Sequence, residues 1–376
     1  MKITVVSRSW PSNERSGVSL VAALHVKVLQ ELGHKISIIG SNKLIDKETI
    51  CHDKTYIRAS GSGSLYSPAR IDRNELRSCL IKSSPDLVIV EAWQTALTDS
   101  SIDIAYDLNI PVLMISHGIS IYPYSLRLSD LIRFLAWWPY KVRKLSSRIG
   151  KLSAITCLDS YSKSTRFYDR DIALKLNIPL LELVNSPVHT PKTILPRAER
   201  KLQILVIGYF SEVKNQLDAL DILSHLPEDL EMRFIGRRTG GYYLKCLKHV
   251  KKLKIEKRVI FSEDNECNIA EEISKSLLIL NTSITEALPV TLLEAMASGT
   301  PFVASPVGAT PSLDCGVIVS NKADKKRAIL SLMNDINYWN KVSTNGLTLF
   351  KNRYTEKHVK FSLSNAVLMA VNYKIV

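Results

Sequence analysis

The stretch 283–305, SITEALPVTLLEAMASGTPFVAS, decides the fold of this chain. The apolar block LLIL at 277–280 precedes it and is typical of a strand buried on both faces of a parallel sheet. Pro289 has the fixed φ of a first helical turn, good helix formers follow it, and Gly299 and Pro301 end that helix. The next apolar run favours a second strand. The stretch therefore predicts strand, loop, helix, turn and strand, as in an open α/β sheet.

Two carboxylates, Glu286 and Glu294, stand eight residues apart in this otherwise apolar stretch. The predicted geometry aims the Glu286 loop and the helix start at the crevice beyond the carboxyl ends of the strands, where ligands bind. A helix N-terminus suits a phosphate, and carboxylates accept hydrogen bonds from hydroxyls. Together these groups would hold a sugar linked to a diphosphate. The alternative stays open that Glu286 caps the helix and that Glu294 is an exposed helix residue.

Residues 286–301 resemble the retaining glycosyltransferases of family 4, which have the GT-B fold. The family signature is Glu-x7-Glu followed by Ala-Met-Ala-x-Gly-x-Pro. This chain matches it at Glu286, Pro289, Glu294, Ala295, Met296, Ala297, Gly299 and Pro301. The resemblance implies that Glu286 contacts the donor sugar and Glu294 the ribose hydroxyls of a nucleoside diphosphate sugar. The backbone at the helix start, from Leu288 and Pro289 to Thr291 and Leu292, would then bind the diphosphate.

Apolar runs alternate with helical patterns along both halves of the chain, which predicts parallel doubly wound sheets. The length of 376 residues favours two domains. We predict an α/β protein of the GT-B fold, with two Rossmann-like domains facing each other across a cleft. The first domain, 1–188, would bind the acceptor, and 189–200 would be a linker. The second, 201–353, would bind the nucleotide sugar, and a helix in 354–376 would cross back to the first domain.

Composition excludes several classes of protein. The six cysteines include no CxxC pair, which indicates a reducing compartment and argues against a disulfide framework or a structural zinc site. The N-terminus becomes polar too soon for a signal peptide, and no apolar run approaches the roughly 20 residues of a membrane span. No GxGxxG motif follows a strand, so an NAD dehydrogenase is not expected. We predict a cytoplasmic protein, at most peripheral on the inner face of the cell membrane.

The loop after the first strand of the second half supplies further donor contacts in the family. Lys214 matches the family's lysine for the diphosphate, beyond Gly208, whereas Tyr209 stands where an arginine is common. The helix amides after Asn215, or another basic residue such as Arg237, would have to replace the missing charge. In the first half, Gly17 is what remains of a glycine-rich loop near the donor phosphates. Two alternatives stay open: Lys214 could be a solvated lysine before a helix, and Gly17 could be a simple turn glycine.

His117 closes the strand at 112–115 in the phrase Ser-His-Gly, where ligands of parallel sheets bind. The resemblance implies that it meets the far side of the sugar or the acceptor. The alternative is a histidine satisfied by backbone groups. The triplet Asp169-Arg170-Asp171 has the form of a metal-binding DxD motif, but no apolar strand precedes it, and we expect a solvated helix face. No metal site and no cofactor are predicted.

The segment 127–151 carries seven basic residues and one acidic residue, a net charge of +6 out of +14 for the chain. Its aromatic block lies beside these cations, a pattern that favours the headgroup region of an anionic membrane. The predicted contact residues are Arg133, Trp137, Trp138, Lys141, Arg143 and Lys144. A core helix with a solvated basic end, or a nucleic-acid groove, remains as an alternative. Pro139 should interrupt the helix.

We therefore expect a metal-independent retaining hexosyltransferase that moves a sugar from a nucleoside diphosphate sugar to a hydroxyl of a glycan or lipid-linked glycan, in bacterial surface polysaccharide or lipopolysaccharide synthesis. Glu286, Lys214 and His117 would act in catalysis, and no nucleic acid is expected as a partner. Two alternatives remain. One is a sugar-nucleotide epimerase of the same fold. The other is a degenerate binding or scaffolding protein, since Ala309 and Ser312 also depart from the family pattern.

Overall fold

The computed structural model describes residues 1–8, 10, 16–40, 53–56, 59–60, 70–123, 128–186, 188, 190–238 and 240–373. Arg127, at the start of the basic segment, lies outside these residues. The chain divides into two compact units. Unit 1 comprises Met1–Pro187 and Glu356–Val376, and unit 2 comprises Val188–Thr355. The end of the chain thus belongs to the same unit as its beginning.

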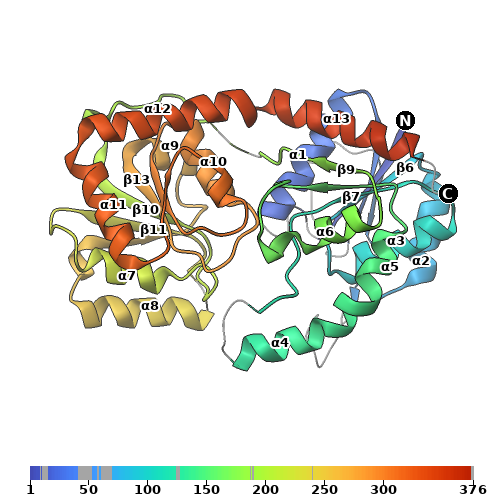
Figure 1. Ribbon diagram of the computed structural model, residues 1–376, viewed down its shortest axis with the longest axis horizontal. Helices are drawn as coiled ribbons and strands as arrows, with labels where there is room; N and C mark the ends of the chain where they lie inside the picture. The colour runs from blue at the N-terminus through green and yellow to red at the C-terminus, as the bar shows by residue number, and fades with distance from the viewer. Residues whose placement is uncertain are drawn as a thin grey trace. The chain divides into compact units, whose positions relative to one another are not determined.

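Unit 1 is built on a parallel sheet whose described strands have the order β3-β2-β1-β6-β7-β8-β9 (Figure 1). These strands are β1 (Lys2–Val6), β2 (Lys35–Gly40), β3 (Asp53–Tyr56), β6 (Leu87–Glu91), β7 (Val112–Ile115), β8 (Ala154–Cys157) and β9 (Leu180–Glu182). A short antiparallel pair consists of β4 (Ala59–Ser60) and β5 (Arg70–Ile71). The predicted parallel α/β architecture is confirmed here, and the chain order reverses between β1 and β6.

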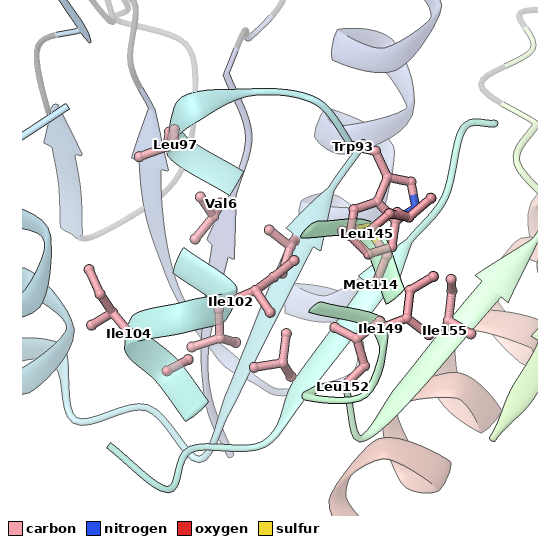
Figure 2. Packing of buried hydrophobic residues seen from close by; sticks show 14 of the residues in the cluster. Val6, Trp93, Leu97, Ile102, Ile104, Met114, Leu145, Ile149, Leu152 and Ile155 are labelled. Atoms are coloured by element: carbon pink, nitrogen blue, oxygen red, sulfur yellow. The ribbon is translucent and has the colours of Figure 1, made fainter. Parts of the chain in front are cut away.

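Helices cover both faces of this sheet. One core joins the sheet to α1 (Gly17–Glu31) and α13 (Glu356–Asn372). The other lies under α2 (Arg73–Ser83), α3 (Ala96–Asp107), α5 (Leu145–Ile149) and α6 (Tyr168–Lys175). Figure 2 shows part of this second core, including Trp93, Met114 and Leu145. α4 (Leu128–Pro139) precedes α5 and is joined to it by a π-helical turn, Tyr140–Lys144.

Unit 2 repeats the plan with a parallel sheet of the order β12-β11-β10-β13-β14-β15. Its strands are β10 (Lys201–Ile207), β11 (Glu231–Ile235), β12 (Val259–Ser262), β13 (Ser276–Asn281), β14 (Phe302–Ala304) and β15 (Val317–Ile318). Its helices are α7 (Gln216–Leu223), α8 (Gly240–Leu253), α9 (Ile269–Lys275), α10 (Val290–Ala297), α11 (Lys322–Asn334) and α12 (Ile336–Arg353). Residues 276–305 form β13, the loop with Glu286, α10 and β14 in the predicted order. Here the chain order reverses between β10 and β13, which makes their carboxyl ends the expected ligand position.

Candidate functional site

An ion pair lies at the switch point of unit 2, where the loops after β10 and β13 meet. Lys214 Nζ donates to Glu286 Oε1 across 2.5 Å, and Ser283 Oγ donates to the same oxygen across 2.8 Å. Both charged side chains are largely shielded, with 21% and 15% of their surface exposed. A small cavity opens beside Lys214 and Thr291 between the two strand ends. The structure therefore brings together the lysine and the first glutamate that the sequence singled out.

Short contacts between the two loops hold this pair. Thr282 Oγ1 donates to the carbonyl oxygens of Lys214 and Asn215, and the amide of Ile284 donates to the carbonyl of Val213. Gln216 Nε2 donates to the carbonyl of Tyr209 across 3.0 Å. These bonds fix the backbone on which Lys214 stands, so its ammonium group is placed by the fold and does not swing freely.

Two glycines allow the loops to approach. Gly208 has φ 144°, and a Cβ added there would meet Lys214 Cε at 3.3 Å, so the lysine stem lies over a residue without a side chain. Gly308 has φ 58°, and a Cβ there would lie 2.2 Å from the carbonyl oxygens of Glu286 and Ala287. The amide of Ala309 donates to the carbonyl of Ala287 across 2.7 Å. The backbone of residues 308 and 309 therefore supports the Glu286 loop. The hydrogen bond uses only the amide of residue 309, so alanine serves there as well as another residue would.

α10 begins directly after this loop, with Pro289 at the N-cap position and no side chain capping it. The alternative in which Glu286 caps this helix is therefore wrong. The expected amide donors also need correction, because Pro289 has no amide hydrogen and the amide of Leu292 donates to the carbonyl of Pro289. The first-turn amides of Val290 and Thr291 have no partner within an α-helix. They remain as donors for an anion, beside Leu288 at the end of the loop.

Glu294 lies on the second turn of α10 and is only partly exposed. Burial raises the pKa of its carboxyl to about 7. Its side chain has no hydrogen-bond donor in the part of the chain that the structure describes. An exposed helix glutamate would not have its pKa raised by burial, so the alternative of an exposed helix residue is wrong for Glu294. A carboxylate in this setting is stabilised by any hydroxyl that donates to it.

The proposed replacement for the family arginine is less well placed. Tyr209 is exposed, and Lys214 Nζ lies 5.9 Å from the centre of its ring. Arg237 is exposed in the loop after β11 and makes no ion pair with other described residues. Its neighbour Arg238 pairs instead with Glu263 and Glu266. A donor-binding role for Arg237 stays a prediction.

In unit 1, Gly17 is the exposed first residue of α1, and Ser16 caps this helix in a reciprocal bond with Ser19. Its φ is not positive, so backbone conformation does not require a glycine there. A role near donor phosphates stays a prediction.

His117 takes part in a buried cluster that the sequence analysis missed. Its Nε2 lies 2.7 Å from Glu91 Oε2, and His25 Nδ1 lies 2.7 Å from Glu91 Oε1. His25 Nε2 lies 3.1 Å from Asn185 Oδ1. The alternative of a histidine held by backbone groups is wrong, because a carboxylate holds it. No local motif marked Glu91 or His25, whereas the position of Glu91 at the end of β6, beside the β1–β6 reversal, was the signal available.

Asp169 was wrongly expected on a solvated helix face. It is 1% exposed and accepts hydrogen bonds from Ser116 Oγ across 2.5 Å and from Trp93 Nε1 across 2.7 Å. Burial raises the pKa of Asp169 although these two groups donate to it. Arg170 is buried as well and donates to the carbonyl of Asp159. The first two residues of the DxD triplet are thus structural, and Asp169 anchors the residue that precedes His117.

The basic segment 127–151 is less positive in its folded surroundings than its sequence suggests. Arg148 pairs with Asp99 and Asp103 at 3.1 and 3.2 Å, and Lys151 pairs with Asp103 at 2.7 Å. These carboxylates lie on α3, outside the segment, so the net charge of residues 127–151 does not include them. α4 ends at Pro139 as predicted, although a π-helical turn continues the chain.

The six predicted membrane residues divide into two groups. Arg133 donates to the carbonyls of Ser120 and Tyr122, Trp137 packs against the core, and Lys141 Nζ lies 4.2 Å from the centre of the Tyr122 ring. These three contact their own unit. The exposed members are Trp138, Arg143 and Lys144. The large apolar side chains exposed near them are Leu128, Leu131, Ile132, Leu135 and Val142.

Comparison with known proteins finds similarity to glycosyltransferases. Residues 190–347 match the family model of the glycosyl transferases group 1. The chain is 30% identical over 116 residues to N-acetyl-alpha-D-glucosaminyl L-malate synthase of Bacillus anthracis. This aligned segment covers 31% of this chain and 30% of that protein. It is 30% identical over 132 residues to lipopolysaccharide 1,6-galactosyltransferase of Salmonella typhimurium. That alignment covers 33% of this chain and 36% of the Salmonella protein. The aligned segment thus spans about a third of the length of these curated relatives.

Similarity to solved structures extends over both units. The structure of HepE from Anabaena in complex with UDP matches 98% of this chain and 100% of that one, with a TM-score of 0.75 and 15% identity. This likeness shows the GT-B fold. Residues 190–347, which lie in the second unit, are thus similar to the glycosyl transferases group 1. No helix among the described residues is both long enough and apolar enough to span a bilayer.

Proposed function

We propose that this protein transfers a sugar from a nucleoside diphosphate sugar to a hydroxyl group of a glycan or lipid-linked glycan, with retention of configuration. The observation that carries the proposal is the Lys214–Glu286 pair beside the start of α10, with the unpartnered carboxyl of Glu294 on the second turn of that helix. The similar HepE has been solved with UDP and with UDP-glucose, which supports a UDP-sugar as the donor class.

The chemistry follows from these groups. The acceptor oxygen would bond to the anomeric carbon while the bond from that carbon to the diphosphate oxygen breaks, and the acceptor proton would pass to the departing diphosphate. Negative charge grows on the diphosphate in the transition state. Lys214 and the amides of Val290 and Thr291 would stabilise it, and fixed donors of this kind commonly supply the largest catalytic contribution. Glu286 would orient the sugar, and His117 would contact the sugar or the acceptor.

Glu294 would bind the ribose, and this offers a test of donor and class together. A panel of nucleotide sugars should give one donor that binds and is turned over, and E294Q should raise the KM for it about 10- to 100-fold, because a charged acceptor of hydroxyl hydrogens is lost. Leu368→Ser on the exposed face of α13 serves as the control and should leave KM unchanged. Binding without turnover under every acceptor condition would favour the scaffold, and interconversion of free donor sugars would favour the epimerase.

The surface of α4 supports a lipid-linked acceptor. Leu128, Leu131, Leu135 and Trp138 recur every three or four residues, so they share one face of the helix, and all four are exposed. Arg143 and Lys144 follow at the end of this face. We infer that this face lies in the headgroup region of an anionic membrane, where a lipid-linked acceptor would be found, with apolar burial contributing more than charge. The Salmonella relative, named for lipopolysaccharide, supports such an acceptor.

A sedimentation assay with vesicles tests this surface. Replacing Leu135 and Trp138 by serine should remove most binding to anionic vesicles. Replacing Arg143 and Lys144 by glutamine should weaken it by about tenfold or more at low salt, since each cation near such a surface contributes about 1 kcal/mol. Phe361→Ser, on the exposed face of α13, is the matched apolar control and should bind as wild type does. Unchanged sedimentation of the Leu135 and Trp138 variant would exclude α4 as the contact.

A further inference from the structure

The geometry of the cluster of His25, Glu91 and His117 determines which ring nitrogens carry hydrogens. Glu91 is the last residue of β6, in register with Ile115 of β7, and both faces of the sheet are covered at this position. Its side chain is 0% exposed, as is that of His25, while His117 is 10% exposed. Only His117 therefore offers the cluster a route to a ligand.

The protonation state of Glu91 follows from its partners. Burial by itself raises the pKa of this carboxyl, but the two imidazoles outweigh burial and lower it. The ionised carboxylate accepts hydrogen bonds and cannot donate them. Each ring nitrogen that faces it must then carry a hydrogen, which places one on His25 Nδ1 and one on His117 Nε2.

Asn185 lies on the far side of His25, where its side-chain amide can take two orientations. If Asn185 turns Oδ1 toward His25 Nε2, the histidine needs a second hydrogen and becomes a buried cation. Asn185 Nδ2 is then buried without an acceptor among the described residues. With the amide rotated by half a turn, Nδ2 donates to the lone pair of a neutral His25, and Oδ1 takes the buried position in which Nδ2 had no partner. Either orientation of the amide leaves Glu91 Oε1 facing His25 Nδ1, so the hydrogen on Nδ1 is common to both.

We propose that Glu91 is a positioning residue that holds His117 as the tautomer with its hydrogen on Nε2, so that Nδ1 presents a lone pair to a hydroxyl of the sugar or the acceptor. This inference rests on the proposed function, since it names what His117 offers to a substrate. His25 and Asn185 support Glu91 from behind. A hydroxyl that donates to Nδ1 would be oriented with its oxygen turned toward the ring.

Long-range ¹H–¹⁵N correlation spectra of protein labelled at histidine nitrogens distinguish the two tautomers without any activity measurement. In the wild type, His117 should carry its hydrogen on Nε2 and His25 on Nδ1, with signals assigned from the H117Q variant. A hydrogen on His117 Nδ1 with a bare Nε2 would overturn the proposal. The spectra test the tautomer of His117 independently of the proposed transfer reaction, which the nucleotide-sugar panel tests.

The variant Glu91→Met keeps the length of the side chain and removes both acceptors. His117 should then populate both tautomers, and kcat should fall about 10- to 100-fold with KM within threefold. D99N is the control, because Asp99 is a buried carboxylate of the same unit that binds Tyr140 and Arg148 and does not contact the cluster. It should leave the His117 signals and kcat as in wild type. A changed tautomer with unchanged kcat, or lost kcat with an unchanged tautomer, would contradict the proposal, and if E91M does not fold the wild-type spectrum decides.

Discussion

Replacing Lys214 by alanine should lower kcat about 100- to 1,000-fold, the range typical of removing one fixed donor from a developing anion. The substitution also leaves Glu286 without its cation, so a negative charge would face the departing diphosphate. Affinity for the donor should fall less than kcat, because the charge on the diphosphate grows in the transition state. Initial rates across donor concentrations separate the two constants, and thermal unfolding checks that the fold is kept.

A double-mutant cycle with Glu286→Ala sharpens this test. Because Lys214 Nζ and Glu286 Oε1 are in contact, the two losses should not multiply, and the double variant should lose less than the product of the single losses. The control is Lys245→Ala, which removes an exposed lysine of the same unit that pairs with Glu212. It should stay within threefold of wild type. If K214A also stayed within threefold, the site assignment would be wrong.

A single methyl group at Gly308 should cost about 100-fold in kcat/KM. The alanine Cβ would stand 2.2 Å from the carbonyl oxygens of Glu286 and Ala287, at a φ of 58° that alanine rarely adopts. Backbone atoms cannot rotate away as side chains do, so the Glu286 loop must move. A displacement of about 1 Å at a reacting centre can lower the rate by about two orders of magnitude.

Gly241→Ala is the matched control for this substitution. Gly241 lies in the first turn of α8, and a Cβ there would meet no atom within 4 Å. Alanine is favoured over glycine in a helix by about 1 kcal/mol, so this variant should unfold at the same or a slightly higher temperature with unchanged kinetics. A folded G308A protein with wild-type kcat/KM would show that the brace between the two loops does not position Glu286.

Local signals predicted the fold of unit 2 well. Pro289, Gly299 and Pro301 each restrict the backbone by their own covalent structure, so the order of strand, helix and strand could be predicted from neighbouring residues alone. The Lys214–Glu286 contact was within reach for a related reason, since both residues follow strands that meet where the sheet reverses its order.

The parts that were missed depend on distant partners. Glu91 meets His25, and His25 meets Asn185, across long separations in sequence that none of these residues determines locally. Likewise, the charge of the basic segment is partly cancelled by Asp99 and Asp103, which α3 supplies. A count of charges along the chain cannot show this, because neutralisation happens across tertiary contacts.

The membership of α13 in unit 1 has a consequence for biosynthesis. Its residues Val359, Leu363, Ala366, Val367 and Ala370 complete the core over α1, yet they are made after all of unit 2. On the ribosome, unit 2 can therefore finish folding as one continuous segment, while unit 1 waits with an apolar face uncovered. A nascent chain of this kind exposes that face for the time needed to translate about 170 residues, about 10 to 30 seconds at about 5 to 20 residues per second, and chaperones can bind it during that time.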